Sequence, residues 1–252
     1  MMEGGIIVNK IEVLQNCRVE GNIVKLPDTQ LDRKVYLEVK KSLELIGGKW
    51  KGGKTYGFVF HSDPSELLLE VSKGSDINLK KEYQFFATPK SLARKLVKMA
   101  EISEEDKILE PSAGQGAIIE QINEVTDIVP DCFEIMDTNK IILEKSDLRF
   151  NLLGDDFLES DNKEYTKIIA NPPFSKNRDI AHVYKMYEKL AYGGRIVTMM
   201  SRHWQKSTNK KEKGFKEFLD RVGARVIEVD AGEFKESGTL IATVIVIIDK
   251  TA

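Results

Sequence analysis

Short apolar segments alternate with longer segments of helical spacing from residue 82 onward in this chain of 252 residues. The apolar segments are rich in β-branched residues, as buried strands are, and the longer ones repeat apolar residues at helical intervals. Regular alternation of this kind predicts an α/β fold in which a mostly parallel sheet carries helices on both faces. The expected strands are residues 107–110, 131–136, 150–153, 165–170, 195–200, 225–229 and 240–248, and the expected helices are residues 88–99, 117–125, 138–145, 179–190 and 214–222.

Residues 1–75 follow a different pattern and predict a small α+β domain ahead of the larger one. The expected strands there are residues 10–14, 17–19, 23–26 and 55–60. We expect the first helix to begin at Asp28, because an aspartate can cap the first turn, and a later helix to begin after Asp63. A polar connector, residues 74–82, then leads to the second domain, residues 83–252.

Residues 48–55 match the phosphate-binding pattern Gly-x-x-x-x-Gly-Lys-Thr, but their context differs from it. That pattern needs a strand before it and a helix after it, whereas here we expect a helix before it and a strand after it. We interpret the segment as a glycine hairpin tip that carries Lys49, Trp50 and Lys51. Such a tip can touch a phosphate backbone or stack on a base. Packing of Trp50 on the core of the small domain is an equally good interpretation.

A tight turn with Gly114 and Gly116 lies between the first expected strand of the second domain and the helix after it. Glycines there let the backbone approach a ligand closely. Glu134 ends the next strand, about twenty residues later, where a carboxylate can accept hydrogen bonds from ribose hydroxyls. The third glycine of a dinucleotide fingerprint is absent, so no pyrophosphate cradle is predicted. Asp156 and Phe157 follow the third strand, where they could bind and cover an adenine ring.

The segment Asn171-Pro172-Pro173-Phe174 follows the expected strand at residues 165–170. Two prolines fix φ, remove two N–H donors and hold the asparagine extended, which makes a rigid ledge at the ligand-binding edge of an α/β sheet. The amide oxygen of Asn171 and the carbonyl of Pro172 can accept hydrogen bonds from the exocyclic amino group of adenine. Those bonds favour a more nucleophilic nitrogen as positive charge develops, while Phe174 stacks on the base. A loop that only turns a corner is the plain alternative.

In their order, these motifs resemble those of amino-methyltransferases that use S-adenosylmethionine (SAM), in particular the N6-adenine DNA methyltransferases of the gamma arrangement. The resemblance covers residues 83–249 and rests on Phe86-Ala87-Thr88-Pro89, the run from Glu110 to Gly116, Glu134, Asp156-Phe157, Asn171-Pro172-Pro173-Phe174 and Phe234-Lys235-Glu236-Ser237-Gly238. It implies a Rossmann-like class I methyltransferase fold with seven strands, the last one antiparallel. It also implies SAM as the cofactor, with no metal.

The resemblance further implies roles for individual residues. Thr88 would contact the methionine carboxylate of SAM, and Phe234 would pack on the target adenine. The cofactor-binding residues would be Thr88, Pro89, Glu110, Pro111, Ser112, Ala113, Gly114, Gly116, Glu134, Ile135, Asp156 and Phe157. The target base would be held by Asn171, Pro172, Pro173 and Phe174.

In that family a large target-recognition domain usually follows the catalytic domain, whereas this sequence ends shortly after its last expected strand. We therefore expect sequence choice to come from residues 1–75, from an inserted loop, or from a partner such as a second copy or a recognition subunit. The best inserted candidate is the expected loop of residues 202–213, where Trp204 and Lys206 lie among further lysines and could clamp DNA. A solvated lysine-rich loop is the alternative.

The formal net charge of −2 means that contact with nucleic acid must come from local basic patches. Cys17 and Cys132 lie in different expected domains, so neither a disulfide nor a metal site is predicted, and a reducing cytoplasm fits. The start of the chain lacks the pattern of a signal peptide, and no stretch is long and apolar enough to span a bilayer.

We therefore predict SAM-dependent methyl transfer to the N6 amino group of adenine in DNA. The base must be flipped out of the duplex, because inside it the ledge is out of reach. The nearest alternatives keep the chemistry and change the substrate to adenine in RNA or to glutamine in a protein. An alternative of another class is a non-catalytic subunit that binds SAM or nucleic acid.

Overall fold

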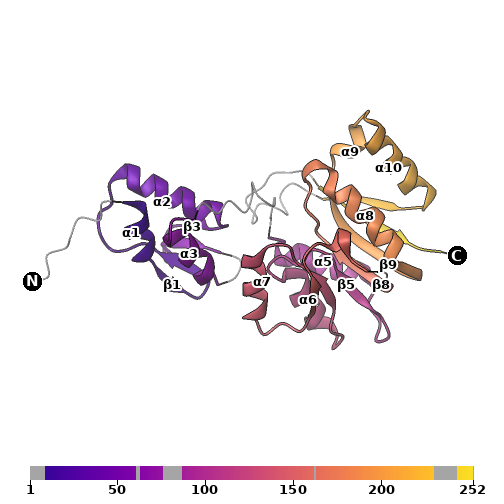
Figure 1. The fold of residues 1–252 in the computed structure, drawn as a ribbon, viewed down its shortest axis with the longest axis horizontal. Coiled ribbons are helices and arrows are strands. Elements are labelled where there is room, and N and C mark those ends of the chain that lie inside the picture. Colours follow the sequence, from indigo (N-terminus) through magenta and orange to yellow (C-terminus); the bar gives the residue numbers. More distant parts are fainter. Residues whose placement is uncertain (1–8, 61–62, 76–86, 162, 230–242, 252) are drawn as a thin grey trace, which may run out of the picture. The chain divides into compact units, whose positions relative to one another are not determined.

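The computed structural model describes residues 9–60, 63–75, 87–161, 163–229 and 243–251. The chain divides into two compact units, residues 1–85 and residues 86–252 (Figure 1).

The N-terminal unit is built on a four-stranded antiparallel sheet with the strand order β1-β2-β4-β3. Its strands are β1 (Arg18–Glu20), β2 (Ile23–Lys25), β3 (Lys49–Lys51) and β4 (Gly57–Val59). Its described helices are α1 (Lys10–Gln15), α2 (Arg33–Leu45) and α3 (Ser65–Ser72). Helix α1 packs on both α2 and α3, so the three helices share one core.

Two sequence predictions for this unit were wrong. Residues 10–14 were expected as a strand, but they lie in α1, where Asn9 accepts a hydrogen bond from the backbone N–H of Glu12 and caps the helix. The helix expected from Asp28 begins later, because the carboxylate of Asp32 accepts from the backbone N–H groups of the first turn of α2. Asp28 instead pairs with Arg18 at 3.5 Å.

The interpretation of residues 48–55 as a hairpin is confirmed. Helix α2 precedes them, β3 and β4 pair in antiparallel fashion across them, and β4 follows. Gly53 adopts a φ of +65° at the tip, a conformation that glycine takes without strain. The segment therefore lacks the strand-loop-helix order of a phosphate-binding loop.

The C-terminal unit contains the predicted seven-stranded, mostly parallel sheet, and its strand order is β10-β11-β9-β8-β5-β6-β7. Five of the strands pair in parallel, and β11 pairs antiparallel with both β9 and β10. The strands are β5 (Ile108–Glu110), β6 (Asp131–Phe133), β7 (Asn151–Gly154), β8 (Tyr165–Ala170), β9 (Leu190–Ser201), β10 (Arg225–Val229) and β11 (Thr243–Asp249).

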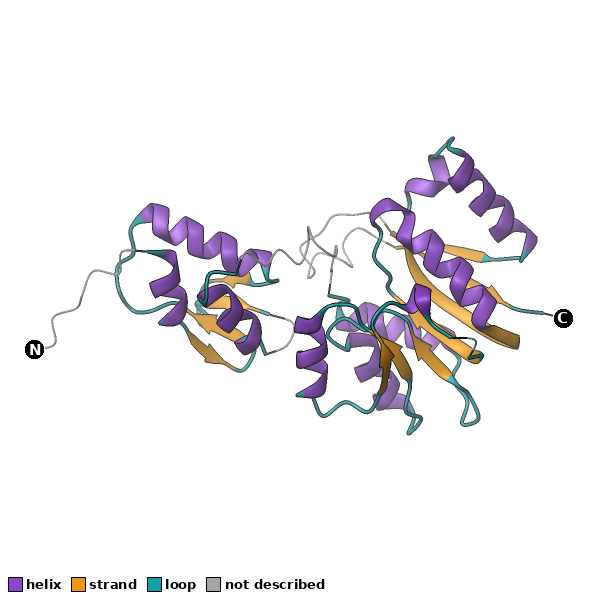
Figure 2. Ribbon diagram, viewed as in Figure 1, coloured by secondary structure: helices purple, strands orange, loops and turns teal. Residues whose placement is uncertain are grey.

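Helices cover both faces of this sheet (Figures 1 and 2). Helices α8 (Arg178–Lys189) and α10 (Lys210–Arg221) pack on one face, and α5 (Lys90–Ala100) and α6 (Ala117–Val125) pack on the other. Helix α7 (Asp137–Glu144) joins α6 in a smaller cluster over β6. The two faces explain the apolar run of β11, because Val244, Val246 and Ile248 enter one core and Ile245 and Ile247 enter the other.

None of the helices in the described part of the chain combines the length and the apolar character needed to cross a membrane.

Phe215 of α10 is the best probe of the core beneath α8 and α10, because it is fully buried and its ring contacts Trp204 edge-on at 5.3 Å. We predict that Phe215→Ala lowers the free energy of unfolding by about 3–5 kcal/mol. Denaturant unfolding measures the change, with Val125→Ala as the control, since Val125 is 63% exposed. A loss below about 1 kcal/mol for Phe215→Ala would contradict this packing.

Candidate functional site

The candidate site lies at the carboxyl edge of the parallel strands. Glu110 ends β5, and Glu134, Asp156 and Asn171 follow β6, β7 and β8. Because these strands are parallel, all four side chains come to the same edge of the sheet. The chain leaves β5 toward β6 and leaves β8 toward β9, in opposite directions across the sheet. Ligands of open α/β sheets bind at such a switch point.

The glycine turn after β5 is tied to the end of β6. The backbone N–H of Ala113 donates to the carbonyl of Phe133 at 2.9 Å, and the N–H of Gly114 donates to Glu134 Oε2 at 2.6 Å. Glu134 Oε1 accepts from the N–H of Met136 at 2.7 Å. Gly114 has a φ of +57°, which turns its N–H toward the carboxylate without strain. The turn and the carboxylate therefore hold each other in place.

Glu110 is the most deeply buried acid of the site, with 2% of its surface exposed. Its carboxylate accepts from the backbone N–H of Ile119 in the first turn of α6, a helix that has no side-chain cap of its own. Its other oxygen, Oε2, has no hydrogen-bond partner among the described residues. Burial, followed by the negative charge of Glu134, raises the pKa of Glu110 well above its ordinary value.

Glu134 is also buried, at 5% exposed, and burial raises its pKa although several hydrogen bonds to the carboxylate oppose the shift. Two neighbouring acids in a low dielectric repel each other and lack water. A cation or a set of hydroxyl donors placed between them would relieve both costs. The hydroxyl of Ser112, in the same turn, is also buried without a partner among the described residues.

Gly116 is required by both conformation and packing. Its φ is +83°, and a Cβ there would lie 2.5 Å from a side-chain carbon of Leu148 and 2.9 Å from one of Leu143. Pro111 is buried behind the turn. These constraints make the turn rigid before any ligand arrives.

At the third strand end Asp156 remains partly accessible, whereas Phe157 lies differently from the sequence prediction. Asp156 Oδ2 accepts from Arg178 Nη2 at 3.0 Å, and its other oxygen accepts from the N–H of Leu158. Phe157 was expected to cover an adenine ring, but it is 1% exposed and packs between Phe133 and His182, each at 5.7 Å. The 3₁₀ turn that begins there points its ring into the core.

Ile135 is the exposed apolar side chain beside the acids, with 40% of its surface open. It follows the buried Glu134 directly, so an apolar surface adjoins the carboxylate at this edge. That placement suits a flat ring bound next to a ribose, and Ile135 is one of the residues expected to bind the cofactor.

The Asn-Pro-Pro-Phe ledge is joined to the first helix of the unit. Asn171 Nδ2 donates to Thr88 Oγ1 at 3.0 Å, and Thr88 is 8% exposed just before Pro89 at the start of α5. The bond turns the amide nitrogen toward Thr88 and so orients the whole amide group. Pro172 is buried, while Pro173 is half-buried. Phe174 is half-buried too and packs against the core on the α5 and α6 face.

The turn after Phe174 is strained and held by a polar chain. Lys176 and Asn177 have φ values of +52° and +60°, which non-glycine residues adopt at a cost. Asn177 Nδ2 donates to Glu212 at 2.8 Å, and its amide oxygen contacts Nε2 of His203. His203 Nδ1 lies 2.5 Å from the hydroxyl of Ser201.

This series of polar side chains ends at Asp179, which is fully buried. Its carboxylate accepts hydrogen bonds from both the hydroxyl and the backbone N–H of Ser201, at 2.7 and 3.2 Å. These contacts connect Asn177 to Asp179 through the ring of His203 and the hydroxyl of Ser201. The polar chain pins the turn to β9, α8 and α10.

The basic loop expected at residues 202–213 is largely helical, which corrects the prediction. His203–Lys206 forms α9, and α10 begins at Lys210. Trp204 was expected to meet DNA, but it is 4% exposed and packs in the core against Phe215. Lys206 is exposed at the end of α9.

The other predicted target contacts lie elsewhere in the chain. Lys49, Trp50 and Lys51 form β3 of the N-terminal unit. Phe234 lies outside the described residues.

Sequence reasoning missed Asn139 and Arg178. Asn139 is fully buried in α7, where its amide bonds to Glu134 and lies 3.5 Å from Gln115 Nε2. It stands four residues before the buried Leu143, so a polar residue on the apolar face of a helix was the available signal. The sequence offers no comparable signal for Arg178.

The fold is that of class I SAM-dependent methyltransferases. A protein of this class from Listeria monocytogenes matches with a TM-score of 0.52 and 12% identity, over 75% of this chain and 67% of the other. The M protein of the type I restriction enzyme EcoKI matches with a TM-score of 0.52 and 12% identity, over 86% of this chain and 54% of its own. A candidate RNA methyltransferase from Pyrococcus horikoshii matches with a TM-score of 0.51 and 17% identity, over 68% of this chain and 89% of the other.

No protein-family model matches the sequence, and no curated protein matches it either. These likenesses are structural, and the identities are low, so they establish the fold.

The buried Glu110 makes stability depend on pH. Its pKa lies above 4.5 in the folded protein, so the folded state holds more protons than the unfolded state above that pH, and stability falls as pH rises. We predict that Glu110→Gln melts higher than the wild type at pH 7–8, by roughly 2–4 °C per kcal/mol of relieved desolvation, and that the gap shrinks toward pH 5.

Thermal melts of the ligand-free protein between pH 5 and pH 8 measure that gap. Glu104→Gln is the control, because Glu104 is exposed on the surface. A difference between Glu110→Gln and the wild type that stays constant with pH would show that the Glu110 carboxyl is not protonated in the folded protein.

Proposed function

We propose that the chain transfers a methyl group from SAM to the exocyclic amino nitrogen of adenine in DNA. The observation that supports it best is the hydrogen bond between Thr88 and Asn171. It joins the element expected to bind the cofactor to the ledge expected to bind the target, at the edge where Glu110 and Glu134 are buried.

The residues at the strand ends fit the cofactor. The unpartnered Oε2 of Glu110 suits the ammonium group of the methionine moiety, and the second lone pairs of Glu134 suit the ribose hydroxyls. Ile135 would lie along the adenine ring, and Asp156, whose side chain is 24% exposed beside Arg178, would accept from its amino group. When bound, SAM supplies an electrophilic methyl group on a sulfonium centre.

The ledge fits the target amino group. In this proposal the amide oxygen of Asn171 and the carbonyl of Pro172 accept its two N–H bonds, which keeps the lone pair on nitrogen instead of in the ring. The bond to Thr88 fixes the amide group of Asn171, so the acceptor needs no reorganisation. Phe174 would stack on the base. A duplex base reaches the ledge only after flipping out, and a single-stranded base reaches it directly.

Adenine in RNA is the second candidate substrate, because a candidate RNA methyltransferase is as similar in fold as the M protein of EcoKI. Both substrates use the same amino group and the same ledge. The aromatic Phe174 favours a base over a glutamine side chain, although glutamine is chemically compatible with the ledge.

Labelled methyl transfer to separate pools of DNA, RNA and protein tests the proposal. We predict incorporation into DNA that digestion assigns to N6-methyladenine. Incorporation into RNA alone would show that the substrate is RNA instead of DNA, while the proposed methyl transfer would stand. A protein that binds SAM and methylates none of the pools would contradict the proposal in favour of a non-catalytic subunit.

Asn171→Ala separates catalysis from cofactor binding. We predict that turnover falls at least 100-fold, since a preorganised acceptor at the reacting group is lost, while the Kd for SAM changes less than about 3-fold. Asn123→Ala is the matched control, because Asn123 lies in the last turns of α6 and bonds to Arg149, away from the carboxyl edge. Near-normal turnover of Asn171→Ala would remove Asn171 from the mechanism.

A further inference from the structure

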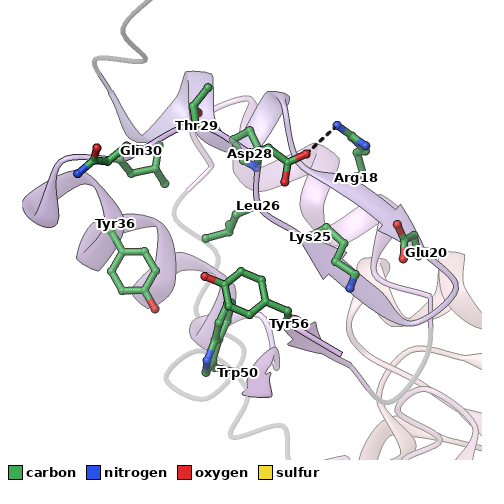
Figure 3. Close-up of a pocket in the computed structure, with 12 residues that line it drawn as sticks. Arg18, Glu20, Lys25, Leu26, Asp28, Thr29, Gln30, Tyr36, Trp50 and Tyr56 are labelled. Carbon is green, nitrogen blue, oxygen red and sulfur yellow. Dashed lines mark hydrogen bonds and ion pairs between the residues drawn. The ribbon is translucent and has the colours of Figure 1, made fainter. Parts of the chain in front are cut away.

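A hollow of about 750 Å³ opens in the N-terminal unit, lined by β1, β2, the segment after β2, α2 and the β3–β4 hairpin. Three aromatic side chains from separate elements face it, namely Tyr36 of α2, Trp50 of β3 and Tyr56 just before β4 (Figure 3). Its volume falls in the range of small-molecule sites. The hollow lies wholly within one unit, at a distance in sequence from the methyltransferase motifs.

Tyr56 is placed there at a conformational cost. Its φ is +35°, which is an outlier for a bulky residue, and 69% of its surface is exposed. Its ring meets Trp50 edge-on at 5.1 Å and lines the hollow. Backbone strain of this kind clusters at ligand-binding sites.

Trp50 is held rigid while it lines the hollow. Its ring packs edge-on at 5.2 Å against Phe58, which is fully buried in the sheet. The tryptophan is therefore fixed by the core on one side and joined to the exposed Tyr56 on the other. A fixed ring loses little entropy when a second flat ring stacks on it.

The lining of the hollow contains two cations, Arg18 and Lys25, and two acids, Glu20 and Asp28, so an excess of positive charge comes only from the adjoining hairpin. The hairpin of residues 49–56 contains Lys49, Lys51 and Lys54 and no acid. The ammonium of Lys25 donates to the carbonyl of Thr55 beside Tyr56, within the same hollow. Stacking rings next to cations are the combination that binds single-stranded nucleic acid, because every base offers a flat face and every nucleotide a phosphate.

We propose that this hollow binds an unpaired nucleobase of single-stranded nucleic acid, stacked on Trp50 and Tyr56, with Lys25 in the hollow and Lys54 at the hairpin tip as the nearest cations for its phosphates. The inference deepens the proposed function and rests on it for its role, since a base flipped from a duplex leaves its former partner unpaired. It assigns the N-terminal unit to substrate binding through stacking, a mode that tolerates many base sequences.

The test uses the full chain and a fluorescein-labelled single-stranded DNA of mixed sequence. We expect Tyr56→Ala and Trp50→Ala each to weaken binding by about 5- to 150-fold, the loss that corresponds to one stacked base. Tyr192→Ala is the matched control, because Tyr192 is 73% exposed in the other unit. Trp50→Phe keeps a ring and should bind better than Trp50→Ala, which guards against a simple folding defect.

Trp50 also reports binding directly. The chain has two tryptophans, so Trp204→Phe leaves Trp50 as the single emitter. We expect its fluorescence to be quenched when the unlabelled single strand is added, and a duplex of the same sequence to compete more weakly. The inference would be overturned if Tyr56→Ala and Trp50→Ala bound the single strand as well as the wild type does. It would also be overturned if the fluorescence of Trp50 did not change, or if the duplex competed as well as the single strand.

The outcomes also separate this inference from the proposed function. If the oligonucleotide quenches Trp50 but none of the pools is methylated, the stacking site stands and the proposed methyl transfer is wrong. If DNA is methylated normally but substitution of Trp50 and Tyr56 leaves binding unchanged, the methyl transfer stands and the stacking site is wrong.

Discussion

The candidate site depends on two carboxylates buried side by side where β5 and β6 end. Glu134 holds the glycine turn through the N–H of Gly114, and Glu110 caps α6 through the N–H of Ile119. Both acids thus organise the backbone that surrounds them. Their burial is costly, since it raises the pKa of both acids and the charge of Glu134 raises that of Glu110 further. One oxygen of Glu110 also has no hydrogen-bond partner among the described residues. Folding leaves that cost in place, and a cationic ligand would relieve it.

The same edge couples the two halves of the site. Thr88 precedes α5 and bonds to Asn171 after β8, so the ledge moves with the first helix of the unit. Beyond the prolines, Asn177 is fixed through His203 and Ser201 to the buried Asp179. The segment between these anchors is stiffened by two prolines. A ledge held at both ends can present an acceptor in one orientation, which is what electrostatic catalysis requires.

Patterns carried by the backbone were readable from the sequence, whereas side-chain orientation was not. The apolar runs and glycine turn predicted the sheet, since period and φ are local properties. Trp204 and Phe157 sit in short helical turns, where the sequence does not tell which face meets the core. The strand expected at residues 10–14 became α1 because the cap from Asn9 and packing on α3 outweigh β propensity. Asn139 was missed although its place on the apolar face of α7 was a readable signal, because the sequence does not show what a buried amide bonds to.

The most direct measurement is the proton balance of SAM binding, by titration calorimetry at pH 6.5 in two buffers of different ionisation enthalpy. At that pH the α-amino group of SAM is cationic, while burial raises the pKa of Glu110 well above its ordinary value and so favours the protonated carboxyl in the ligand-free protein. Binding of the ammonium should ionise Glu110, so the wild type should release up to about one proton, and Glu110→Gln should bind about 10- to 100-fold more weakly and release none. SAM binding by the wild type with no proton release would contradict the role given to the buried pair.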